Sequence, residues 1–242
     1  MKALLLLAVF AAAHALPPAP RASRTHAETG AAGQQARAGT SIQDLLAGLK
    51  SKDEDASADA ADALEKRGAE AVPFLEQFLK TERGDDYRLR AAVVLAEIEP
   101  DDAVIVPTLL RIAKGRSLFD SEKTLQTRRS AGMLLSLTPA GIRTLPALLK
   151  DEDTFVRRSA AFALDDPTEV LADLSPALRA AIYDVMPALT AALGDKDEVV
   201  HEMCCEVLAQ IYRSKVEPLS SRAEELLKQS GKTRGDCLCE CD

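Results

Sequence analysis

Apolar residues recur along most of this chain at the spacing of one helical face, and they do so in a motif that repeats. The clearest copy, 156–164, reads VRRSAAFAL: an arginine, a pair of small residues and an aliphatic ending. The same skeleton occurs at 87–95 and 127–135, a looser copy lies at 200–208, and the weakest begins at Ala56. Self-similarity at a fixed spacing is typical of arrays of stacked helical hairpins.

A second motif precedes each of the four later copies, a proline placed just before an apolar helical face. These prolines are Pro73, Pro107, Pro146 and Pro187, spaced by 34, 39 and 41 residues. Proline is tolerated in a first helical turn, where its missing N–H has no partner to lose. The first repeat lacks it, and Ser41 with Asp44 predicts a capping box there instead.

The pattern predicts an all-α protein, a right-handed α-solenoid of about five helical hairpins, in residues 41–231. The expected helix pairs are 41–51 with 57–67, 71–80 with 87–98, 104–114 with 124–137, 142–150 with 155–164, and 184–193 with 198–213. A helix over about 219–229 is expected to cap the open end. The stretch 165–181 is an insertion in which Ser175-Pro176 begins a further helix.

The proline-led helix, the acidic turn 151–153 and the V-R-x-x-A-A-x-A-L segment together resemble the HEAT-like repeat of the phycobilisome-lyase type. The resemblance covers about residues 41–213. It implies the repeat architecture, and it says little about function because one fold carries many activities.

The N-terminus predicts export. A positive start, an apolar run over 3–13 and the small-residue pattern Ala13-His14-Ala15 are the parts of a signal peptide, 1–15. An apolar run of this length is too short for a membrane span, so none is expected after cleavage. Residues 16–40, rich in proline and small polar residues, predict a disordered linker. The expected location is periplasmic or extracellular.

Three arginines at one repeat position, Arg88, Arg128 and Arg157, follow acidic residues by about one turn. They predict a structural ladder in which each guanidinium pairs with turn carboxylates of its own or the next repeat. The alternative is a basic stripe for an anionic ligand. The formal net charge of −8 makes nucleic acid a poor partner for the whole chain.

The outward face of the second helices is the predicted partner-binding surface. On a helical projection, its apolar members are expected to be exposed and to be rimmed by two arginines. The surface consists of Leu89, Val93, Arg129, Met133, Arg158 and Phe162. Burial of the apolar members by the curvature of the array is the alternative.

His201-Glu202 resembles a repeat of deoxyhypusine hydroxylase, whose paired His-Glu motifs hold two irons. The equivalent positions in the other repeats, such as Arg157-Arg158, offer no ligands, so no di-iron centre is expected. We expect no cofactor and no catalytic residue.

The cysteines fall into two groups. Cys204 and Cys205 replace the small pair of the motif and are expected to be packing residues. Cys237, Cys239 and Cys241 lie in a polar tail, 232–242, and suit disulfide formation in an oxidising compartment or, with fewer ligands than usual, a soft metal.

The predicted function is that of an exported scaffold, not an enzyme, which binds a protein partner of unknown identity. Two alternatives stay open: a HEAT-repeat enzyme, either bilin-lyase-like or metal-dependent, and a structural envelope protein that associates with itself. The oligomeric state does not follow from the sequence.

Overall fold

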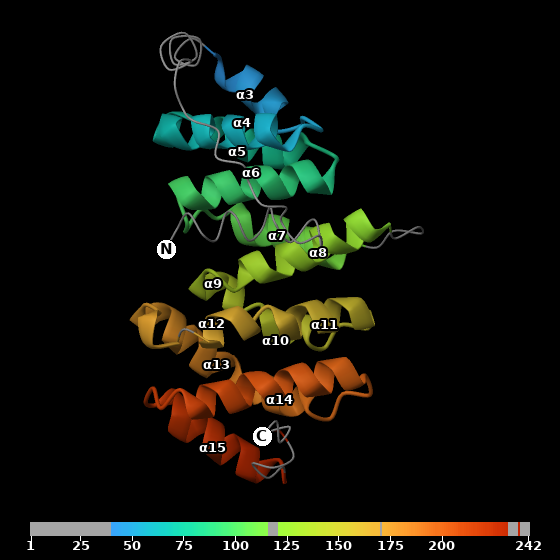
Figure 1. Ribbon diagram of the computed structural model, residues 1–242, viewed down its shortest axis with the longest axis vertical. Helices are drawn as coiled ribbons and strands as arrows, with labels where there is room; N and C mark the ends of the chain where they lie inside the picture. Colours follow the sequence, from blue (N-terminus) through green and yellow to red (C-terminus); the bar gives the residue numbers. More distant parts are fainter. Residues whose placement is uncertain (1–39, 116–120, 170, 232–236, 238–242) are drawn as a thin grey trace, which may run out of the picture. The chain divides into compact units, whose positions relative to one another are not determined.

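All regular structure in the described part of the chain is helical. The computed structural model describes residues 40–115, 121–169, 171–231 and 237 (Figure 1). The predicted signal peptide 1–15, most of the linker 16–40 and most of the tail 232–242 lie outside these residues. The described α-helices are α3 (Ile42–Gly48), α4 (Glu54–Arg67), α5 (Val72–Thr81), α6 (Asp85–Ile98), α7 (Ile105–Lys114), α8 (Glu122–Leu135), α9 (Pro139–Ile142), α10 (Leu145–Leu148), α11 (Thr154–Phe162), α12 (Asp165–Glu169), α13 (Pro176–Ala192), α14 (Glu198–Arg213) and α15 (Leu219–Gln229).

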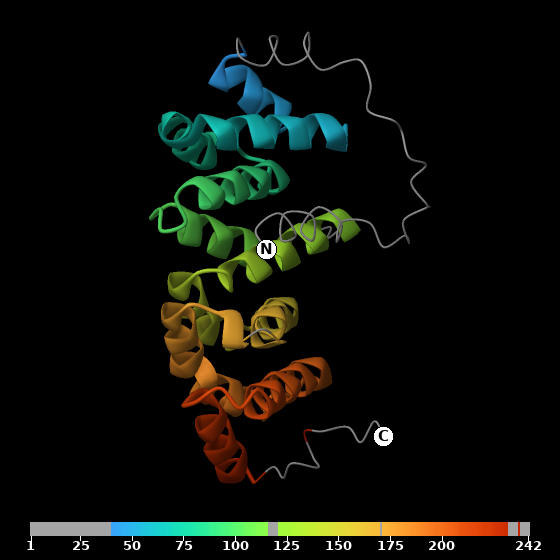
Figure 2. The same cartoon turned by 60° about the vertical axis from the view of Figure 1, so that its left-hand side comes forward.

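The chain forms two compact units. One holds the described residues up to Thr108 together with the start of α8 to Thr127, and the other holds 109–115 and the described residues from Arg128 onward. In the first unit α6 packs against α5 and α4, and in the second α14 packs against α11, α13 and α15 (Figures 1 and 2). Each unit is a stack of helical hairpins, which confirms the predicted α-solenoid class. The right-handed sense of the array stays a prediction.

The helix starts follow the predicted chemistry. The Ser41 hydroxyl accepts from the Asp44 backbone N–H (3.2 Å) and donates to the Asp44 carboxylate (2.6 Å), which closes the first turn of α3. Pro73 and Pro146 lie in the first turns of α5 and α10. Small residues then set how closely helices approach: a Cβ on Gly48 would lie 2.8 Å from that of Ala60, so α3 and α4 pack with no room for a side chain there.

The fifth hairpin begins earlier than predicted. The expectation that a helix starts near 184 with Pro187 in its first turn is wrong, because α13 starts at Pro176 and continues through Pro187. Ser175 caps it by accepting from the Leu178 backbone N–H at 3.2 Å. Pro187 removes one helical hydrogen bond, to the carbonyl of Tyr183, at an exposed position where water is available. The Ser175 cap and the buried face of α13 therefore stabilise this helix by more than the hydrogen bond lost at Pro187 destabilises it.

The insertion between the fourth and fifth repeats docks on α14. The Gln210 side chain donates to the Asp165 carboxylate (2.9 Å) and accepts from the Thr168 hydroxyl (2.5 Å). The helix expected over 142–150 is shorter than predicted: it is α10, Leu145–Leu148, and a separate short helix, α9, ends at Ile142 before it. A Cβ on Gly141 would lie 2.1 Å from the Leu135 carbonyl oxygen, so only glycine fits where α9 meets the end of α8.

A disulfide joins Cys205 in α14 to Cys237, with Cα atoms 5.1 Å apart and a sequence separation of 32. Both half-cystines are buried, at 4% and 6% exposure. The prediction that Cys205 only packs in the core is therefore incomplete, because Cys205 also forms this disulfide. Cys239 and Cys241 lie outside the described residues. The bond fixes one point of the C-terminal tail onto the last hairpin.

We predict that reduction of this disulfide destabilises the second unit. In the chain-entropy model, opening a loop of this length lowers the free energy of unfolding by about 3 to 4 kcal/mol. Guanidinium denaturation of the full chain with and without dithiothreitol measures the change.

The double variant Cys205→Ala, Cys237→Ala is the control, and its midpoint is expected to be independent of reductant. An unchanged wild-type midpoint, with thiol titration showing complete reduction, contradicts the prediction.

Candidate partner-binding surface

A hairpin turn of constant design positions the second helix in four of the repeats. The side chain at its first position accepts from the backbone N–H two residues later: Ser51 from Asp53, Glu82 from Gly84, Asp151 from Asp153, and Asp195 from Asp197, at 2.9 to 3.1 Å. In three of these turns the later residue is also an aspartate that caps the second helix. Each turn therefore presents a carboxylate at its first position, its third position or both.

Two of the ladder arginines reach from one repeat into the turn of the next. Arg157 donates to both carboxylate oxygens of Asp195, from Nε at 2.7 Å and from Nη2 at 3.1 Å, and also to the backbone carbonyls of Asp151 and Glu152. Arg128 donates to Asp153 at 2.7 Å and stacks 4.5 Å from the centre of the Phe155 ring. Both arginines are buried, so these bonds fix how consecutive hairpins stack.

Arg88 behaves differently from its two equivalents. It pairs with Asp85 of its own helix at 2.7 Å, and its buried Nε has no hydrogen-bond partner. In the first unit Arg90 makes a further link between repeats: it donates to the carbonyls of Leu49 and Ser51 and to the Ser57 hydroxyl. The sequence motif did not single out Arg90, because it lies two residues beyond the ladder position.

Folding lowers the pKa of three turn carboxylates, those of Glu82, Asp195 and Asp197. The Gly84 backbone N–H, and after it the Lys50 ammonium, lower the pKa of Glu82 to about 2. The Arg158 guanidinium lowers the pKa of Asp197 to about 2. Burial alone would raise the pKa of Asp195, but the hydrogen bonds from Arg157 and from the Asp197 backbone outweigh it and lower that pKa.

The six residues of the predicted partner-binding surface differ in how deeply they are buried. Leu89 and Val93 are 7% and 6% exposed, so the expectation that they are exposed is wrong. The reason is that α6 lies against both α5 of its own hairpin and α4 of the preceding one, and buries more than one face. They are core residues of the first unit.

The other four members lie on the second unit, on α8 and α11. Arg129 is exposed and its guanidinium lies 5.6 Å from the centre of the half-buried Phe162 ring. Met133, one helical turn from Arg129, is half-buried. Arg158 is exposed and forms a bidentate pair with Asp197 at 2.9 and 2.8 Å. We call Arg129, Met133, Arg158 and Phe162 the second-helix surface.

The two helices that carry this surface approach closely. A Cβ on Gly132 would lie 3.4 Å from the Ser159 backbone oxygen, so the small residues at these positions let α8 and α11 pack tightly. Arg129 and Phe162 meet across this contact. The second-helix surface is thus continuous across a repeat boundary.

The His201 side chain forms a hydrogen bond to the backbone. Its Nδ1 lies 2.6 Å from the Leu193 carbonyl oxygen, which only accepts, so Nδ1 donates. Burial, and after it the Asp195 charge, raises the pKa of the neighbouring Cys204 thiol to about 12, so this thiol is a poor nucleophile and metal ligand at neutral pH. Over the described residues, no three His, Cys, Asp or Glu side chains converge as metal ligands do.

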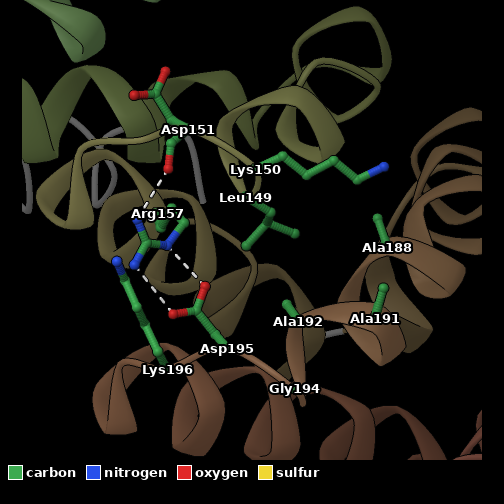
Figure 3. Close-up of a pocket in the computed structure, with 10 residues that line it drawn as sticks. All are labelled: Leu149, Lys150, Asp151, Arg157, Ala188, Ala191, Ala192, Gly194, Asp195 and Lys196. Carbon is green, nitrogen blue, oxygen red and sulfur yellow. Dashed lines mark hydrogen bonds and ion pairs between the residues drawn. The ribbon is translucent and has the colours of Figure 1, made fainter.

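A feature that the sequence did not reveal is a pocket of about 510 Å³ between the turns of the fourth and fifth repeats (Figure 3). Its walls come from the turns at 149–151 and 194–196 and from α13. The lysines that line it are ordinary turn residues in the sequence, and only the stacking of the two hairpins brings them together.

None of the helices over the described ranges has the length and hydropathy to cross a bilayer.

Comparison with known proteins gives structural likenesses only. No protein-family model matches the chain, and no curated protein matches it. A designed armadillo repeat protein in complex with the peptide (KR)4 is 16% identical over 77% of this chain and 88% of its own, with a TM-score of 0.42. YibA of E. coli is 18% identical over 86% and 82%, with a TM-score of 0.38, and an engineered protein is 21% identical over 79% and 98%, also at 0.38. The fold assignment above depends on the helices themselves.

Two adjacent arginines provide a matched test of the turn contacts. Arg157→Met leaves the Asp195 carboxylate, whose side chain is 11% exposed, without its partner and is expected to lower the free energy of unfolding by about 3 kcal/mol. Arg158→Met breaks a bidentate pair whose arginine side chain is 44% exposed, and is expected to cost about 1 kcal/mol or less. Urea denaturation of both variants measures the difference, and equal losses contradict the structural role of Arg157.

Stability is also expected to fall in acid. A carboxyl whose pKa is lowered by folding stabilises the protein above its ordinary pKa, and this contribution is lost as pH falls towards the folded value. The window runs from about pH 4.5 down to about pH 2 for Glu82, and from about pH 3.8 down to about pH 2 for Asp197. Denaturation curves across this range measure it.

Glu82→Gln is expected to lower stability at pH 7 and to make the acid loss shallower. Glu76→Gln is the control, because it makes the same change in an exposed pair with Lys80 on α5. A wild-type acid profile in Glu82→Gln contradicts the assignment.

Proposed function

We propose that this protein is an exported repeat scaffold that binds a protein partner through the second-helix surface. The observation that carries the proposal is the Arg129–Phe162 contact, an aromatic ring and a guanidinium held together at 5.6 Å at the surface of two packed helices. Arginine, methionine and aromatic residues are enriched where proteins bind one another, and they contribute strongly to binding energy.

The surface is preorganised. The side chain of Arg158 is held by Asp197, and that of Arg129 lies over Phe162, so each loses little conformational freedom when a partner binds. Met133 adds a half-buried, adaptable apolar group beside them. A partner with an apolar anchor and a nearby carboxylate suits this combination.

Export is proposed from the N-terminal pattern and is supported by the disulfide. Disulfides persist in oxidising compartments and are rare where thiols are kept reduced. The buried Cys205–Cys237 bond in the structure is consistent with a periplasmic or extracellular protein. Retention of residues 1–15 in the mature protein, measured by intact mass, would argue against cleavage after Ala15.

The enzymatic alternative has little support among the described side chains. His201 is engaged by a backbone carbonyl, and the ladder arginines Arg128 and Arg157 are engaged by turn carboxylates. The third reading, a structural envelope protein, requires association of copies of this chain, which size measured with and without reductant would reveal.

The binding surface is tested by a pair of substitutions. Met133→Ser with Phe162→Ser removes the apolar and aromatic groups, and is expected to weaken capture of the partner at least tenfold because such residues are typical hot spots. Cross-linking with the full chain as bait, followed by quantitative mass spectrometry, measures the capture. Circular dichroism is expected to show unchanged helix content.

Tyr183→Ser is the control, since it removes an aromatic side chain that is 39% exposed on α13, outside the surface. Equal capture by all three proteins, or iron or bilin bound to the purified wild type, contradicts the proposal. Loss of helix content in the double variant would show that Met133 and Phe162 are needed for the core instead.

A further inference from the structure

The pocket between the fourth and fifth repeats has the volume of a small-ligand site and a lining that is partly apolar and partly charged. Its volume of about 510 Å³ lies within the range of small-ligand pockets. Leu149 of one turn and three alanines of α13 supply apolar walls, and Lys150 and Lys196 supply charge (Figure 3). It shares no residue with the second-helix surface.

The carboxylates of the pocket are already paired. Both oxygens of Asp195 accept from Arg157, at 2.7 and 3.1 Å, and Asp151 pairs with Lys114 at 3.1 Å. Neither carboxylate pairs with Lys150 or Lys196. Those two ammonium groups have no ion pair with any described residue.

Lys150 is an exception to a regular pattern. Lys50 and Lys114 hold the same place at the end of a first helix, and each pairs with the first carboxylate of the next turn: Lys50 with Glu82 at 2.7 Å, and Lys114 with Asp151 at 3.1 Å. The equivalent carboxylate for Lys150 is Asp195, which Arg157 holds with both oxygens. The side chain of Lys150 instead extends over the α13 alanines, away from Arg157 (Figure 3).

The balance of charge in the pocket is therefore positive. Arg157 offsets Asp195 and Lys114 offsets Asp151, so the two lysines remain as uncompensated charges in a chain whose formal net charge is −8. Such a local excess attracts anions. A simple anion would leave the apolar walls in contact with water. A ligand that also carries an apolar group binds more favourably, because it removes the apolar surface of these walls from water.

We propose that this pocket binds an acidic peptide segment of a partner protein, with Lys150 and Lys196 pairing with its carboxylates and its aliphatic side chains against Leu149 and the α13 alanines. Peptide carboxylates alternate with side chains that can cover the apolar walls, and this is the complementarity that the pocket offers. The site is separate from the proposed second-helix surface, and its test does not depend on it.

The test uses a fluorescein-labelled six-residue peptide of alternating glutamate and leucine, titrated with the full chain and followed by fluorescence anisotropy. Lys150→Glu with Lys196→Glu is expected to weaken binding at least tenfold. Both lysines are exposed and form no ion pair with the described residues, so the thermal midpoint of the variant is expected to stay at the wild-type value. Raising the salt concentration is expected to weaken wild-type binding.

Lys52→Glu is the matched control, because Lys52 holds the turn position of Lys196 in the first repeat, is exposed and pairs with no residue in the described part of the chain. It is expected to bind the peptide within twofold of wild type. A second peptide with glutamine for glutamate is expected to lose binding, and inorganic phosphate is expected to compete only at far higher concentration.

Four outcomes would overturn the proposal. Equal binding by the lysine variant and wild type would remove the site. Equal affinity for the glutamate and glutamine peptides would remove its charge selectivity, and phosphate that competes as well as the peptide would reduce it to a simple anion site. Binding that emerges only in the variant Glu240→Gln, Asp242→Asn would identify the occupant as the chain's own acidic tail and not a partner.

Discussion

The stacking of this protein depends on the contact between a cation of one repeat and the carboxylate-bearing turn of the next. The bidentate pair of Arg157 with Asp195 is its most buried form, with 6% and 11% of the two side chains exposed. A helical hairpin cannot bury its apolar face alone, so neighbours must supply the rest of the core. Apolar packing is not directional, whereas a guanidinium that must meet two carboxylate oxygens and two carbonyls tolerates one stacking arrangement. The energetic gain from such a pair is small, and its loss is costly, because the remaining charge would be buried unpaired.

The same contact shapes the surfaces proposed for binding. Where a lysine makes the link, as Lys50 does to Glu82, the turn carboxylate is used and the lysine is held in place. Where Arg157 binds both oxygens of Asp195, Lys150 pairs with no described carboxylate, and a positively charged pocket lies between the two turns. The neighbouring Arg158 takes the second aspartate of that turn and is fixed at the edge of the second-helix surface.

Much of the fold follows from the sequence because the repeat is a local pattern. The proline-led helices and the V-R-x-x-A-A-x-A-L segment each fit within one hairpin, and their hydrophobic spacing fixes the helices to within a few residues. The errors concern contacts between hairpins. A projection of α6 shows one buried stripe, whereas the structure buries Leu89 and Val93 as well, because two other helices lie against α6. The pairing of Cys205 with Cys237 and the release of Lys150 are likewise set by which residues meet across hairpins, and spacing along the chain does not contain that information.

The proposed binding residues also show why stability and recognition need not conflict here. Arg157 and Arg158 are neighbours in sequence, yet helix geometry turns them in different directions, one buried against Asp195 and one exposed beside Asp197. The buried arginine secures the stacking, so the exposed one can change with little loss of stability. Lys150 and Lys196 have the same freedom because they pair with no described residue. Adjacent repeats of one architecture can therefore differ in the ligands that they bind while the turn contacts that hold them together stay the same.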